Sequence, residues 1–261
     1  MEPIRDPDPA PPESLRRLVF YSLLTGLCPL IPIPFLDDWV RDLLRRRLVL
    51  ELVRGRGLDL GGPSVKVLAC GESPLTARGC LGGCFALAVV KPLFKAAVKL
   101  AAKLFRKVLV VLAVREGVLT FSITFHEAYL VRHALALGAL AGPRPPVLAV
   151  RRAIEAARAG SGHRPIERLA RRTMRGSWRL LRRGGRELTR LARRLRRSAR
   201  DEEEIVRGAL DLEAEERVLG GLVDELTEEI EQEDGYLRQL EQSFEKHLAD
   251  RLAAASRVDS I

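Results

Sequence analysis

The stretch RPIERLARRTMRGSWRLLRRGGRELTRLARRLRRSAR, residues 164–200, carries the pattern that decides the fold class. On a wheel of 100° per residue, all its arginines fall within an arc of about 160°, and leucine and isoleucine occupy the other side. This period predicts an amphipathic α-helix, because side chains of a strand would alternate instead. If continuous, the helix would be roughly 55 Å long, with Gly184 and Gly185 as the place for a kink or a close helix contact.

The segment that follows has the opposite charge. Residues 151–200 carry 18 arginines and three glutamates, a net charge of +15, whereas residues 201–261 carry 6 basic and 19 acidic side chains, a net charge of −13. Leucines also form a stripe along 201–252. Two such helices are expected to pair as an antiparallel hairpin that partly neutralises its own charge. A fragment 147–261 is then expected to be soluble and helical alone.

Composition extends the helical prediction to the whole chain. The 261 residues are 47% hydrophobic but only 5% aromatic, so leucine, alanine and valine must build the core. Leucine and alanine favour helices, whereas strands favour aromatic and β-branched residues. We therefore predict an all-α protein in which a hydrophobic multi-helix module precedes a long charged helical hairpin. The predicted parts are a disordered Pro-rich tail at 1–14, the apolar module at 15–140, a linker at 141–147 and the hairpin at 148–255.

Residues 19–36 are uncharged and long enough to suggest a membrane span. Three prolines within this run argue against a simple spanning helix, because proline removes a backbone donor and restricts the residue before it. We predict instead a helix to about Leu27, a tight apolar turn and a second helix. Asp37 or Asp38 would cap the second helix, which would end at about Arg54.

This arrangement carries a resemblance. The stretch GLCPLIPIPFLDD (26–38) lies between two hydrophobic helices, and RGRGLDL follows at 54–60. Residues 15–60 resemble bacterial membrane-associated helical families of unknown function, including the EcsC-like family and a family found beside or fused to membrane-associated GTPases. The resemblance implies a membrane-proximal helical module and supplies no catalytic residue, and this chain has no nucleotide-binding domain of its own. The other interpretation is a buried turn in a soluble core.

A second cationic helix is predicted at KPLFKAAVKLAAKLFRK, residues 91–107, which contains no acid. Its basic residues fall within an arc of about 160°, opposite an apolar face. An anionic bilayer would suit such a face, because lysine stems lie along apolar groups while their ammonium ends reach headgroups. The alternatives are a core helix whose lysines face water, and nucleic acid. The predicted membrane or anion-binding residues are Lys91, Lys95, Lys99, Lys103, Arg106 and Lys107.

Motifs for enzymatic chemistry are missing. No Walker loop, GxSxG or HExxH occurs, so we predict no catalytic, cofactor-binding or metal-binding residue and no cofactor. His126 and His133 would share one helix face as a metal pair, or they are polar residues on a helix flank. Cys70, Cys80 and Cys84 supply three thiols, but no CxxC pair or nearby histidine completes a zinc site.

These patterns predict a non-enzymatic helical protein that associates peripherally with a membrane and contacts protein partners. The alternative is a nucleic-acid-binding protein, because arginine presents a planar fork that suits phosphate. Aromatic side chains are scarce in 164–200, which argues against base stacking. The amino terminus lacks the pattern of a secretion signal, so we expect a cytoplasmic protein, with the inner face of the membrane as a further location. The nucleic-acid-binding residues of the alternative are Arg179, Arg182, Arg183 and Arg186.

Overall fold

The computed structural model describes residues 12–31, 36–71, 91–142, 145–162, 164–198, 202–207 and 212–258. Within these helices, the structure describes the backbone but not the side chains at 12–14, 91–112, 164, 178, 197–198, 202–204 and 255–258. Of the predicted Pro-rich tail, residues 1–11 also lie outside it.

The all-α prediction is confirmed: the described residues form ten α-helices and one short 3-10 helix, without a strand. The first five elements are α1 (Pro12–Leu27), η1 (Cys28–Leu30), α2 (Leu36–Gly55), α3 (Gly62–Cys70) and α4 (Lys91–Ala136). The remaining six are α5 (Val147–Ser161), α6 (Arg164–Gly176), α7 (Trp178–Ser198), α8 (Glu202–Arg207), α9 (Glu213–Glu231) and α10 (Asp234–Val258).

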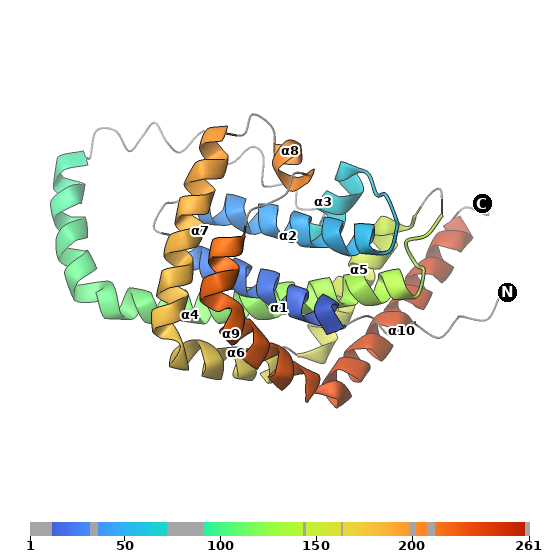
Figure 1. Cartoon of the computed structure of the whole chain (residues 1–261). Coiled ribbons are helices and arrows are strands. Elements are labelled where there is room, and N and C mark those ends of the chain that lie inside the picture. The colour runs from blue at the N-terminus through green and yellow to red at the C-terminus, as the bar shows by residue number, and fades with distance from the viewer. Residues whose placement is uncertain are drawn as a thin grey trace.

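Helix α4 is the centre of the bundle, and α1 packs along it more extensively than any other helix does (Figure 1). The two backbones approach closely where Gly26 of α1 faces Gly117 of α4. A Cβ atom built on Gly117 would lie 2.4 Å from the carbonyl oxygen of Gly26. Any side chain there would push the helices apart, so this pair of glycines sets the distance between α1 and α4.

The turn after α1 follows the prediction made from its prolines. Helix α1 ends at Leu27 as expected, and one 3-10 turn follows it. Helix α2 then begins at Leu36, so Asp37 and Asp38 lie inside its first turn instead of at the cap position. Acidic side chains in a first turn still stabilise a helix, because its amino-terminal end carries partial positive charge.

The arginine-rich segment is not one continuous helix. It divides into α6 and α7 at Ser177, which is not the predicted weak point. Gly184 instead provides the close helix contact, because a Cβ atom there would lie 3.0 Å from Leu219 and 3.1 Å from Leu27. The absence of a side chain at Gly184 thus lets α7 pack tightly against α9 and α1.

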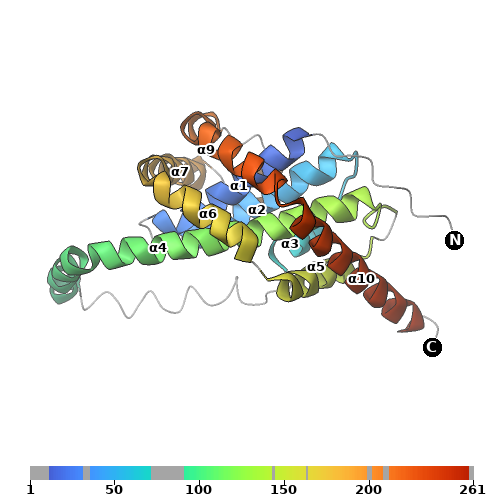
Figure 2. The same cartoon turned by 90° about the horizontal axis from the view of Figure 1, so that it is seen from below.

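The basic and acidic helices pack against each other and also on the apolar helices. Helix α9 contacts α6, α7 and α1, and α10 runs along α5 (Figure 2). One hydrophobic cluster includes Phe121 of α4, Leu188 of α7, Leu219 of α9 and Phe244 of α10. The residues predicted as the hairpin therefore share their core with the residues predicted as the apolar module. Whether 15–140 and 148–255 fold independently stays a prediction.

Candidate functional site: the arginine face of α7

Helix α7 buries one side and presents arginine on the other. Its inner side places Leu181, Leu188 and Ala192 in the core, where they are at most 2% exposed. The 3.6-residue period that buries these side chains turns the intervening arginines toward solvent. The exposed arginines of α7 are Arg179, Arg182, Arg183, Arg186, Arg190, Arg193, Arg194 and Arg196.

The structure brings together all four arginines of the nucleic-acid alternative. Counted from Arg179, the other three arginines lie three, four and seven residues further along the helix, at 182, 183 and 186. The four side chains therefore lie on one helix face. None of the four forms an ion pair within the described residues. Four like charges so close together repel each other. An anionic surface would relieve this repulsion.

Several acids of α9 and α7 pair with residues other than the four middle arginines of α7. On α9, Glu216 and Asp224 each lie 2.8 Å from the guanidinium of Arg16 in α1 and raise its pKa. Glu229 pairs with Arg172 of α6. Glu187, on α7 itself, pairs with Arg190. The tertiary structure therefore pairs three acids of α9 with α1 and α6, and none of the described ion pairs reaches the four middle arginines of α7.

The predicted lysine face lies in the first part of α4, whose backbone is helical as expected. The side chains of Lys91, Lys95, Lys99, Lys103, Arg106 and Lys107 lie outside the described residues, so their surroundings stay a prediction. Figures 1 and 2 show this part of α4 extending clear of the other helices, at the end of the molecule where α7 lies.

His126 and His133 connect α4 to α10. The Nε2 atom of His126 lies 2.6 Å from the Tyr236 hydroxyl, and its Nδ1 lies 2.5 Å from the Ser122 carbonyl oxygen. The Nε2 atom of His133 lies 2.8 Å from Glu245. The ring nitrogens of both histidines therefore face α10 or their own helix. Among the side chains that the structure describes, no three His, Cys, Asp or Glu are grouped as a metal ion requires.

Glu127, between the two histidines in sequence, is the acid of a buried charge network that the sequence analysis missed. Its Oε1 lies 3.2 Å from Arg151 and 3.2 Å from Arg158, and its Oε2 lies 3.8 Å from Arg45. Burial alone would lower the pKa of Arg151, but Glu127 and Glu155 raise it above its ordinary value. The network joins α2, α4 and α5 and is structural. The one feature of the sequence that could have indicated this network was Glu127 itself, an acid within a largely apolar helical stretch.

The thiols carry no reactive site among the described residues. Cys28 and Cys70 are both free, and burial raises the pKa of both, that of Cys28 to about 12. A thiol with so high a pKa is a poor nucleophile at neutral pH, because the thiolate is the reactive form. Cys80 and Cys84 lie outside the described residues.

Comparisons with known proteins add no assignment. No protein-family model matches the chain, and neither the curated proteins nor the solved structures include one that is significantly similar. The resemblance of residues 15–60 to the EcsC-like family therefore stays a prediction. Within the described part of the chain, no helix has the length and apolar character needed to cross a bilayer.

Proposed function

We propose that this is a non-enzymatic helical protein that binds an anionic membrane surface through α7. The observation that carries the proposal is the row of exposed arginines at 179, 182, 183 and 186, none of which has an ion-pair partner in the described structure. Each basic residue near an anionic leaflet contributes about 1 kcal/mol, so four contribute about 4 kcal/mol, or roughly a thousandfold in affinity.

Two features favour a bilayer over nucleic acid. Leu180 lies between these arginines and is 37% exposed. Its apolar side chain can enter the headgroup region beside its cationic neighbours. The first part of α4 has an apolar face opposite its lysines in the sequence, and its backbone extends clear of the bundle at the same end of the molecule (Figure 1). A bilayer would accommodate both the cations and an apolar helix face, whereas a duplex would use only the cations.

Sedimentation with liposomes tests the proposal. We expect the protein to bind vesicles that contain phosphatidylserine, to ignore neutral vesicles, and to dissociate as salt rises, because salt screens exposed charges. The test variant replaces the four arginines by glutamine, which keeps helix propensity and removes only charge. The control variant removes the same charge from α9 and α10, at Arg217, Arg238, Lys246 and Arg251.

The two variants separate the specific face from overall charge. The proposal requires that the α7 variant lose binding to anionic vesicles while the control keeps it. Equal losses in both variants would show that net charge alone drives binding and would refute the α7 site. If the wild-type protein ignored anionic vesicles at low salt but bound random duplex DNA, and the α7 variant lost DNA binding, the nucleic-acid alternative would replace the membrane proposal. A protein that bound at the inner face of the membrane would also be available to protein partners there.

A further inference from the structure

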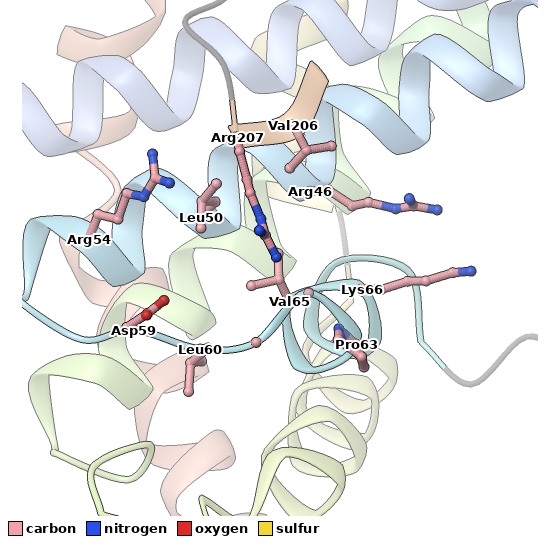
Figure 3. A pocket seen from close by; sticks show the side chains of 12 residues that line it. Arg46, Leu50, Arg54, Asp59, Leu60, Pro63, Val65, Lys66, Val206 and Arg207 are labelled. Carbon is pink, nitrogen blue, oxygen red and sulfur yellow. The ribbon is translucent and has the colours of Figure 1, made fainter. Parts of the chain in front are cut away.

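A cleft separate from α7 lies where α2, α3 and α8 meet. Its volume is about 590 Å³, within the range of small-molecule sites. Figure 3 shows Arg207 lying across its centre, with Arg54 on one side and Arg46 and Lys66 on the other. Arg207 is distant in sequence from the other three, so only folding brings the four cations together.

The charge of the cleft is unbalanced. Among the described residues that line it, four are basic and one, Asp59, is acidic. Arg54 and Lys66 are exposed and form no ion pair with any described residue. A concave site with walls of one charge focuses the potential and attracts a counter-ion.

A neighbouring cleft shows what a balanced site looks like in the same molecule. It is larger, about 1040 Å³, and shares Arg54 with the first. Its other charges are paired: Arg47 lies 2.8 Å from Glu51, and Arg16 lies 2.8 Å from Glu216. In the smaller cleft, Arg54 and Lys66 both lack an ion pair within the described residues, so positive charge stays uncompensated there.

The remaining walls of the cleft define the rest of the ligand. Helix α3 begins at this cleft, and its cap residue Gly61 offers no side chain to its first N–H groups. Such a helix end adds partial positive charge and backbone donors to a site that already holds four cations. Leu50, Val65 and Val206 form an apolar wall. The ligand is thus expected to carry both an anionic group and an apolar part.

We propose that this cleft binds a phosphate monoester attached to a small apolar group. Arginine suits this ligand because its planar fork forms paired hydrogen bonds with phosphate oxygens, and lysine adds a point charge. A phosphate monoester can come from a lipid headgroup, as in phosphatidic acid, or from a soluble phosphorylated metabolite. No residue of α7 lines the cleft, so the proposal is independent of the membrane-binding face.

Isothermal titration calorimetry of the full chain at low salt tests the site. The probes are inorganic phosphate, glycerol 3-phosphate and short-chain dioctanoyl phosphatidic acid. The test variant carries Arg54→Gln and Lys66→Gln, and the control variant carries Arg56→Gln and Lys246→Gln. All four positions are exposed and without an ion pair in the described structure, so both variants should fold and both lose two charges.

We expect saturable binding of at least one phosphorylated probe, weakened about tenfold or more in the test variant and less than about twofold in the control. Binding of phosphatidic acid alone supports the site with a lipid source, and binding of glycerol 3-phosphate supports it with a soluble source. An absence of saturable binding for all three probes overturns the proposal, and so does an equal loss in both variants. The α7 variant should keep this binding, which separates failure here from failure of the membrane proposal.

Discussion

Replacement of Gly117 by alanine tests the packing of α1 on α4 at its tightest point. The added Cβ atom would lie 2.4 Å from the Gly26 carbonyl oxygen and 3.5 Å from its carbonyl carbon. The opposing atoms belong to backbone, so no side chain can rotate away, and the two helices must separate by several tenths of an ångström or more. Because α1 packs on α4 more extensively than any other helix does, that separation loosens much of the core.

The expected cost follows from two opposing effects. Overpacking of a close contact destabilises a protein by about 1–3 kcal/mol, and the absence of a movable side chain places this site at the upper end of that range. Alanine in place of glycine inside a helix returns about 1 kcal/mol. Gly117→Ala should therefore lower the free energy of unfolding by about 2 kcal/mol, or the melting temperature by about 4–8 °C.

Gly221→Ala is the matched control. Gly221 lies inside α9, and a Cβ atom there would meet nothing within 4 Å, so only the gain of about 1 kcal/mol applies. Urea denaturation followed by circular dichroism at 222 nm measures both variants. The predicted difference between them is about 3 kcal/mol. If both substitutions stabilised the protein alike, the close approach of α1 and α4 at the glycine pair would be wrong.

Three further predictions concern the core. Glu127→Gln should lower the free energy of unfolding by about 3 kcal/mol, because it breaks a buried ion pair and leaves arginine charge uncompensated. Glu155→Gln, the control, changes a side chain that is 44% exposed and should cost less than about 1 kcal/mol. Equal costs of the two substitutions in urea denaturation would contradict this network. Stability should fall as pH rises from about 9 to 12, because burial raises the pKa of Cys28 from 9.0 to about 12 and that of Tyr236 from 10.0 to about 12, so that in this window only the unfolded chain loses these protons. Thermal melts across this range should show the decline, and Tyr236→Phe should make it shallower. Fragment 147–261 was expected from the sequence to be soluble and helical alone. We now expect it to aggregate or to unfold without cooperativity, because its helices bury their apolar sides against α1 and α4. A monomeric fragment with a sharp thermal transition would support an independently folded hairpin.

The sequence alone determined the features that depend on neighbouring residues. The 3.6-residue period indicated the helices, and the prolines after Leu27 indicated where the first helix ends. The arginine face of α7 could also be predicted from the sequence, because i, i+3, i+4 and i+7 spacing places side chains together regardless of what the helix packs against. The division at Ser177 could not be predicted from the sequence, which placed the weak point at Gly184 and Gly185. In the structure Gly184 lies inside α7, where a Cβ atom would be 3.0 Å from Leu219 and 3.1 Å from Leu27.

Only the tertiary structure decided which charge meets which. From composition, the acids of 201–261 were expected to neutralise the arginines of 164–200 in part. Glu229 does pair with Arg172, but Glu216 and Asp224 pair with Arg16, some 200 residues away in the chain. Arg45 is likewise distant in sequence from Glu127, and Arg207 is distant from the other three cations of the cleft. Charge is long-ranged but pairing requires atoms within a few ångströms, and such distances between remote residues exist only after the helices have packed.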